Sequence, residues 1–148
     1  MTKLVFASDH AGHTLRKHLM ACAEAWGHTV LDLGPADGER GDYPLYAARL
    51  AQAMKQDDTL RGILICGSGI GACMAANRFS WIRAALCEHE TAARLCRQHN
   101  DANVLCMGER LIGTAVAEAV LHIFLTTEFE GGRHQQRVEQ LRTLGESP

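Results

Sequence analysis

The sequence predicts an α/β fold in which a doubly wound parallel sheet of about five strands lies between two layers of helices. Strand-like and helix-like segments alternate along the whole chain, which is typical of parallel sheets. Residues 62–66 form an apolar run that suits a strand buried on both faces. The longer segments between the strands carry apolar residues at helical spacing, so we expect amphipathic helices to cover the sheet.

The first half of the chain contains two predicted strands and two predicted helices. Residues 3–8 and 29–32 are the strands, and residues 12–27 are a helix that ends at Gly27. A turn-rich stretch at 34–42 leads into a helix that starts at Pro44 and runs to about residue 56. The apolar face predicted for the first helix consists of Leu15, Leu19, Cys22, Ala23 and Trp26.

The second half continues the alternation and ends in two helices. Strands are predicted at 62–66, 83–87 and 103–107, with helices at about 69–77, 90–99, 114–125 and 134–144. The buried stripe predicted for the helix at 114–125 consists of Val116, Val120, Leu121 and Phe124. We therefore expect one domain over residues 1–148, a Rossmann-like three-layer α/β/α sandwich with a C-terminal helix.

Composition excludes several classes of function. Fifteen Lys and Arg residues nearly balance 17 Asp and Glu residues, and no basic run suggests a nucleic-acid or membrane surface. No apolar stretch approaches the roughly 20 residues of a membrane span, and the N-terminus does not read as a signal peptide, so a cytoplasmic location is expected. Six cysteines without a Cys-x-x-Cys pair, and histidines without metal-like spacing, predict neither disulfides nor a metal site.

Two loops are predicted to form the functional site. In doubly wound sheets ligands bind beyond the carboxyl ends of the strands where the winding reverses, commonly between the first and third strands. There Asp9 and His10 follow the first strand, and Cys66 opens a glycine-rich turn after the third. The glycines allow successive N–H groups to point at one spot, next to the start of a helix. A thiol at this position is expected to be partly ionised and reactive.

Other interpretations of the glycine-rich turn fit less well. Gly67, Gly69 and Ala72 match a dinucleotide fingerprint, with Glu88 as the ribose acid, but that fingerprint normally follows the first strand and leaves the cysteine unexplained. The spacing of a P-loop and the arginine of a cysteine phosphatase are both missing after Cys66. A thiolate base beside N–H donors suits proton abstraction next to a sugar carbonyl, with Ser68 relaying a proton and no metal or cofactor required. A non-catalytic domain that binds a nucleotide or sugar phosphate is the alternative from another class, although such a domain has no use for Cys66.

Over nearly its full length the chain resembles the type B ribose 5-phosphate isomerases, whose wider group includes the galactose 6-phosphate isomerase subunits. The resemblance is carried by six motifs: Ser8-Asp9-His10-Ala11-Gly12, Asp42-Tyr43-Pro44, Cys66-Gly67-Ser68-Gly69-Ile70-Gly71, Ile82-Arg83-Ala84-Ala85, the run from Arg97 to Val104, and Gly131-Gly132-Arg133. The chain departs from the pattern at Ser68, where a threonine is common, and at Trp81, where a small residue is usual. The tryptophan at position 81 bears on which sugar phosphate is the substrate more than on which reaction is catalysed.

The resemblance implies a role for each site residue. Cys66 would carry a proton between C1 and C2, with the amides of Gly67, Ser68, Gly69, Ile70 and Gly71 holding the enediolate, and His99 would open a furanose ring. The sugar would be bound by Asp9, His10, Tyr43 and Asn100, and the phosphate by Arg110, Arg133 and Arg137. Arg133 and Arg137 are four residues apart, which predicts one shared helix face, and His134 is expected outside the site.

The same resemblance implies a partner and a substrate. The partner is a second copy of the chain, in a homodimer with shared active sites that could pair into a tetramer. The expected substrate is ribose 5-phosphate, converted to ribulose 5-phosphate. Isomerases of a tetrulose 4-phosphate, or of allose or galactose 6-phosphate, are the alternatives within the resemblance.

Overall fold

The computed structural model describes residues 1–145, so residues 146–148 of the predicted domain lie outside the described residues. Every predicted strand and helix is present, within about two residues of its expected bounds. The elements are β1 (Lys3–Ser8), η1 (His10–Gly12), α1 (His13–Ala25), β2 (Thr29–Asp32), α2 (Tyr43–Gln56), β3 (Arg61–Cys66), α3 (Ile70–Ala76), β4 (Ala84–Leu86), α4 (Glu90–Asn100), β5 (Val104–Gly108), α5 (Thr114–Thr126), η2 (Gly132–His134) and α6 (Gln135–Thr143).

The five strands form one parallel sheet in the order β2-β1-β3-β5-β4. β1 and β3 are therefore neighbours, and the predicted reversal of winding between the first and third strands is confirmed. A second reversal occurs because β5 lies between β3 and the edge strand β4. The register pairs Cys66 at the end of β3 with Gly108 at the end of β5.

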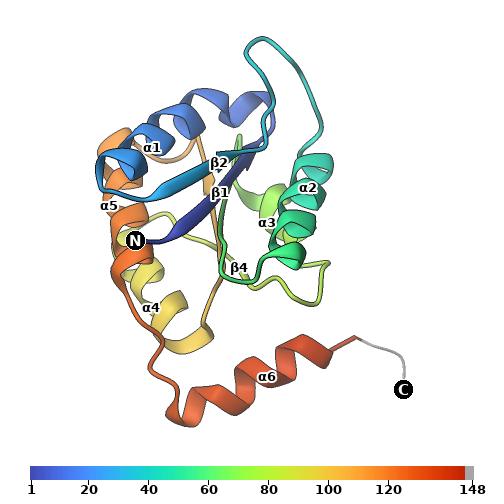
Figure 1. Cartoon of the computed structure of the whole chain (residues 1–148), viewed down its shortest axis with the longest axis vertical. Helices are drawn as coiled ribbons and strands as arrows, with labels where there is room; N and C mark the ends of the chain where they lie inside the picture. Colours follow the sequence, from blue (N-terminus) through green and yellow to red (C-terminus); the bar gives the residue numbers. More distant parts are fainter. Residues whose placement is uncertain (146–148) are drawn as a thin grey trace.

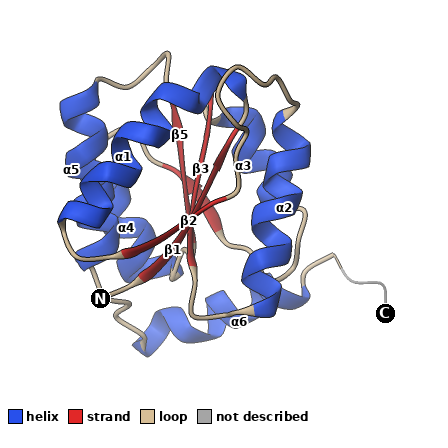
Figure 2. Cartoon of the chain, turned by 45° about the horizontal axis from the view of Figure 1, so that its top comes forward, coloured by secondary structure: helices blue, strands red, loops and turns tan. Residues whose placement is uncertain are grey.

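Helices cover both faces of the sheet, which confirms the predicted three-layer sandwich. Figure 2 shows α1, α4 and α5 on one side of the strands and α2 and α3 on the other. Each layer encloses its own apolar cluster, and β3 contributes Ile63 and Ile65 to one cluster and Leu64 to the other. All three side chains are fully buried, as expected for a central parallel strand.

The buried stripes of α1 and α5 differ from the predicted ones at their margins. Trp26 and Val116 were predicted to be buried but are 40% and 42% exposed, and Cys22 is half-buried. On α5 the stripe is centred on Ala117, and Val116 lies about 100° around the helix from it. On α1 the buried residues are Leu15, Arg16, Leu19 and Ala23, which turns Cys22 toward the edge of the layer.

Arg16 is a buried charge that the sequence pattern did not reveal. Its guanidinium donates to Ser8 Oγ at 2.6 Å and to the carbonyl oxygen of Pro35 at 2.5 Å, and its Nε lies 3.2 Å from Asp32 Oδ1. Burial lowers the pKa of Arg16, and the charge of Asp32 opposes that shift. The contacts tie α1 to the carboxyl ends of β1 and β2, beside the predicted site.

α6 extends away from the body of the molecule. Figure 1 shows it at the bottom, at the opposite end from the loop that joins β2 to α2. Val138 is its one buried residue, whereas Leu141 and Leu144 are exposed. A groove of about 530 Å³ separates this segment from the loop before β4, with Phe79 and Leu141 among its lining residues. Among the described residues, no helix is both long enough and apolar enough to cross a bilayer.

Candidate active site

The loop after β3 curls back onto the Cys66 sulfur. Cys66 ends β3 with 4% of its surface exposed, and the Gly69 N–H donates to its Sγ at 3.1 Å. Gly69 adopts the left-handed conformation with φ 77°, which favours glycine and allows the chain to enter α3. The Ser68 hydroxyl accepts from the Ile70 N–H at 3.2 Å. The thiol therefore sits at the base of a short loop, with the Gly69 amide directed at its sulfur.

Asp9 and His10 lie at the end of the neighbouring strand. The Asp9 N–H donates to the carbonyl oxygen of Ile65 at 3.2 Å, which joins this loop to the strand that ends in Cys66. Asp9 Oδ1 accepts from the N–H groups of Ala11 and Gly12 at 3.0 and 3.1 Å, and neither bond uses Oδ2. His10 Nδ1 lies 3.3 Å from the carbonyl oxygen of Gly41. The buried carboxylate is thus oriented by the backbone and keeps one oxygen for a ligand.

Tyr43 and Arg110 flank the glycine-rich loop. A Cβ atom at Gly71 would lie 2.6 Å from Tyr43 Cζ, so the ring packs directly on that glycine. Arg110 donates its N–H to the carbonyl oxygen of Gly67 at 3.0 Å, and its guanidinium lies over the same residue. An aromatic ring and a cation therefore border the loop. That Tyr43 binds the sugar and Arg110 the phosphate stays a prediction.

Gly108 and Glu109, at the end of β5, complete the floor of this loop and were missed by the sequence analysis. A Cβ atom at Gly108 would lie 2.6 Å from Ser68 Cα. The Glu109 N–H donates to the carbonyl oxygen of Cys66 at 3.0 Å, and its carboxylate accepts from the Leu15 N–H. Both residues directly follow a predicted strand, which is a common place for site residues. The sequence does not show that this strand lies beside β3, so it could not connect them with Cys66.

The other predicted site residues lie near the amino ends of the strands, whereas Cys66 lies at a carboxyl end. His99 and Asn100 end α4, just before β5 begins, and the amino end of β5 pairs with Gly62 rather than with Cys66. Five strand residues at about 3.3 Å each separate the two edges by roughly 16 Å. One copy of the chain therefore does not bring His99 to Cys66.

This second group surrounds a small groove between α4 and α6. The groove, of about 360 Å³, is lined by His99, Asn100, His134, Arg137, Val138 and Leu141. The rings of His99 and His134 stack with centroids 4.4 Å apart and an interplanar angle of 13°. Glu130 Oε2 lies 4.0 Å from His99 Nε2 and 3.8 Å from His134 Nε2. Imidazole, amide and guanidinium groups thus meet where a phosphorylated ligand could bind.

The model of the ribose/galactose isomerase family matches residues 4–141. The chain belongs to that family. It is 43% identical over 144 residues to ribose-5-phosphate isomerase B of Escherichia coli, covering 97% of each chain. The structure of ribose 5-phosphate isomerase B from Anaplasma phagocytophilum is 46% identical with a TM-score of 0.91, covering 95% of this chain and 97% of that one. That of the Mycoplasma genitalium enzyme with bound ribulose-5-phosphate is 40% identical with a TM-score of 0.90, covering 99% and 98%.

Within this member of the ribose/galactose isomerase family, the residues around this groove differ in two details from the predicted phosphate-binding group. α6 begins at Gln135, so Arg133 lies in η2 and does not share a helix face with Arg137 as the spacing predicted. His134, expected outside the site, is buried against His99, and Arg133 Nε lies 3.4 Å from its Nε2. Burial lowers the pKa of His134, and His99 and the two arginines lower it further, which favours a neutral ring.

Trp81, the larger departure from the family pattern, packs against α2 and not against the Cys66 loop. Its Nε1–H donates to the carbonyl oxygen of Ala51 at 2.8 Å, and Lys55 Nζ lies 4.6 Å from its ring centroid. Phe79 contacts the ring at a centroid distance of 5.3 Å. Ala51 and Lys55 lie in the last two turns of α2, which lead to the amino end of β3. Within one chain, the indole is therefore a packing residue.

Proposed function

We propose that the protein is an aldose–ketose isomerase that interconverts ribose 5-phosphate and ribulose 5-phosphate. The observation that carries the proposal is the Cys66 thiol, which meets the Gly69 N–H at the carboxyl end of a central strand. A purely binding loop has no need of a buried nucleophile at that point. The E. coli relative is named for this activity, and the M. genitalium relative was solved with ribulose-5-phosphate.

The proposed reaction is a proton transfer through an enediolate. The Cys66 thiolate removes the C2 proton of the open-chain aldose, and the electron pair moves onto the carbonyl oxygen at C1. Loop amides stabilise that oxygen, and Ser68 passes the hydroxyl proton from O2 to O1. Cys66 then returns its proton to C1, which gives the ketose. Oxidation at C2 balances reduction at C1, so the step needs no external redox partner.

The active form is proposed to be a homodimer. The Cys66 loop and the group around His99 lie at opposite edges of one sheet, so a second copy must supply one of them. The exposed Leu141 and Leu144 of the protruding segment offer apolar surface for such an interface. His99 of one chain would then protonate the ring oxygen of a furanose held by the other, while Arg133 and Arg137 grip its phosphate.

A cytoplasmic location fits this chemistry. All six cysteines are free thiols, and a base that works as a thiolate requires a reducing compartment. We therefore place the protein in a compartment that keeps Cys66 reduced.

Substitution of Cys66 tests the role of the thiol. We expect Cys66→Ala to abolish exchange of the substrate C1 and C2 protons with solvent, with a loss of activity of at least about 100-fold. Affinity for a phosphorylated ligand should stay within about tenfold, roughly 1.4 kcal/mol, because the binding groups remain. NMR in deuterated water measures the exchange and calorimetry the affinity. Cys73→Ala is the matched control, and exchange that persists in Cys66→Ala would sink the assignment.

A panel of sugar phosphates tests the substrate. The purified protein is assayed with tetrose, pentose and hexose phosphates in a coupled isomerisation assay. We expect kcat/KM to be greatest for ribose 5-phosphate. A preference for the tetrose or the hexose would leave the reaction in place and overturn the substrate.

A further inference from the structure

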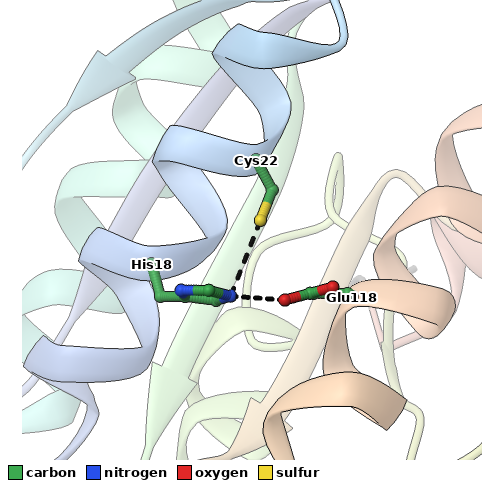
Figure 3. Close-up of side chains that lie close together, drawn as sticks. All are labelled: His18, Cys22 and Glu118. Carbon is green, nitrogen blue, oxygen red and sulfur yellow. Dashed lines mark hydrogen bonds and ion pairs between the residues drawn. The ribbon is translucent and has the colours of Figure 1, made fainter.

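α1 and α5 bring together three side chains that the proposed isomerase reaction does not use. Figure 3 shows His18 and Cys22 on α1 facing Glu118 on α5. His18 Nε2 lies 2.6 Å from Glu118 Oε1 and 3.6 Å from Cys22 Sγ. An imidazole nitrogen, a thiol sulfur and a carboxylate oxygen thus lie within 4.8 Å of one another. Their helices belong to the α1, α4 and α5 layer, and the three side chains are separate from both groups of the candidate active site.

The backbone arranges these groups as a metal-binding site would. His18 and Cys22 are four residues apart on one helix, so their side chains lie one above the other on the same face. In a tetrahedral zinc site, nitrogen and sulfur ligands are about 3.5 Å apart, and nitrogen and oxygen ligands about 3.3 Å apart. The observed nitrogen to sulfur distance matches. The carboxylate is hydrogen-bonded to the ring and would withdraw by several tenths of an ångström.

The surroundings leave the three side chains accessible to an ion. All three residues are half-buried, so an ion can reach them and yet be partly shielded from water. A groove of about 380 Å³ reaches His18 and is lined also by Thr14, Thr114 and Glu109. Burial raises the pKa of the Cys22 thiol, and Glu118 raises it further. A raised pKa keeps the thiol protonated near neutral pH, and a bound cation would displace that proton into solvent.

We propose that His18, Cys22 and Glu118 bind a zinc ion that holds α1 and α5 together. The mixed nitrogen, sulfur and oxygen set suits a borderline-soft divalent ion, and zinc accepts all three donors in tetrahedral geometry. The fourth position is left to water. An ion held by two helices binds the folded chain and not the unfolded one, so it stabilises the fold without entering the reaction.

A second cluster, His99, Glu130 and His134, must be distinguished in any test. Its ligands are two nitrogens and one carboxylate, with no sulfur. Its two rings are stacked face to face, so their nitrogens do not converge on one point as those of a chelating pair would. Absorption from a bond between a thiolate and a metal would therefore report on the cluster with Cys22 and not on the cluster around His99.

Cobalt, which substitutes for zinc and absorbs light, is the probe. The metal-free protein is titrated with Co²⁺, and we expect one equivalent to produce thiolate-to-cobalt charge-transfer absorption in the near ultraviolet, which added Zn²⁺ abolishes. Cys22→Ala should lose the absorption. Glu118→Gln, of the same shape, should weaken binding at least tenfold.

Thermal unfolding gives a second readout. At roughly 100 times its dissociation constant, Zn²⁺ should raise the Tm of the wild type by several degrees and that of Cys22→Ala by none.

Two controls exclude Cys66 and Cys73 as the source of the absorption. Cys66→Ala and Cys73→Ala should both keep the charge-transfer absorption, because neither thiol belongs to the cluster. The proposal is overturned if the wild type shows no such absorption, or if Cys22→Ala keeps it. Unchanged affinity in Glu118→Gln would overturn the assignment of the carboxylate and leave a two-ligand site.

Discussion

At the scale of single residues, the candidate site depends on what is absent as much as on what is present. Gly71 has no side chain, and the Tyr43 ring occupies the space in which one would lie. The Arg110 guanidinium covers Gly67 less closely, since a Cβ there would lie 3.3 Å from its Nη1. The loop after β3 is thus held between an aromatic ring and a cation, and its amides are fixed relative to the Cys66 sulfur.

Gly71→Ala should displace the Tyr43 ring. The added Cβ would lie 2.6 Å from Tyr43 Cζ, so the ring, which is 40% exposed, must move aside and we expect KM to rise. The free energy of unfolding should change by no more than about 1 kcal/mol, because alanine favours the helix that contains position 71. Urea unfolding and steady-state kinetics measure the two effects. Gly113→Ala is the matched control for KM, since its φ is −72° and a Cβ there meets nothing within 4 Å. Equal behaviour of the two variants would contradict the role given to this contact.

Arg137→Ala tests the proposed phosphate grip. Loss of a charge-assisted hydrogen bond of about 1.5–3 kcal/mol should raise KM for the sugar phosphate at least roughly tenfold, with a smaller change in kcat. Inhibition by phosphorylated and unphosphorylated sugars measures the selectivity. Arg142 lies on the same helix but pairs with Glu139 on the surface, so Arg142→Ala should behave as the wild type. Unaltered selectivity in Arg137→Ala would refute the assignment.

The sequence predicted those site residues that follow from local rules. Asp9, His10 and Cys66 could be placed together because the switch-point rule needs only the order of strands along the chain. The contributions of Arg16, Gly108 and Glu109 could not be predicted. Each depends on which segments lie side by side in space, and no periodicity in the sequence records that.

At the scale of elements, capping and periodicity determined the helices, whereas pairing determined the sheet. Gly27 ends α1 with φ 91°, as its position predicted. The stripes of α1 and α5 were displaced at their margins, because a helix in a layer faces a neighbouring helix as well as the sheet. The place of β5 between β3 and β4 was beyond prediction, since both positions satisfy the same apolar pattern.

Trp81→Phe separates packing from sugar selection. The variant loses the hydrogen bond to the Ala51 carbonyl, so we expect the free energy of unfolding to fall by roughly 1 kcal/mol while kcat/KM stays unchanged. Urea unfolding and the sugar-phosphate panel are the measurements. Trp26→Phe is the comparison, because Trp26 is 40% exposed and should cost less. A changed order of preference among the sugars would show that Trp81 reaches the pocket.

At the scale of the whole molecule, the two halves of the candidate site face away from each other. The carboxyl edge of the sheet carries the thiol, and the groove between α4 and α6 carries His99 and Arg137. An assembly that joins these halves must place the carboxyl ends of the strands of one chain against the groove between α4 and α6 of its copy. Each such pair would contain two equivalent sites.

Mixed subunits test this arrangement directly. Cys66→Ala and His99→Asn should each be inactive toward the furanose substrate. After subunit exchange about half of the dimers are mixed, each with one intact site, so activity should recover to about a quarter of the wild-type value. Differently tagged chains, purified together, verify the exchange. Mixed dimers that remain inactive would show that Cys66 and His99 act within one chain.

The position of β5 also determines the order in which the chain can acquire its structure. β4 pairs with β5 alone, so during synthesis β4 and α4 have no sheet edge to join until residue 108 has emerged. Up to that moment the chain can build only the sheet of β2, β1 and β3. The Cys66 loop, whose floor is Gly108, can be completed once β5 has joined the sheet, whereas the groove beside His99 also needs His134 and Arg137. Within one chain, the half of the candidate site that holds the thiol is therefore assembled before the half around His99.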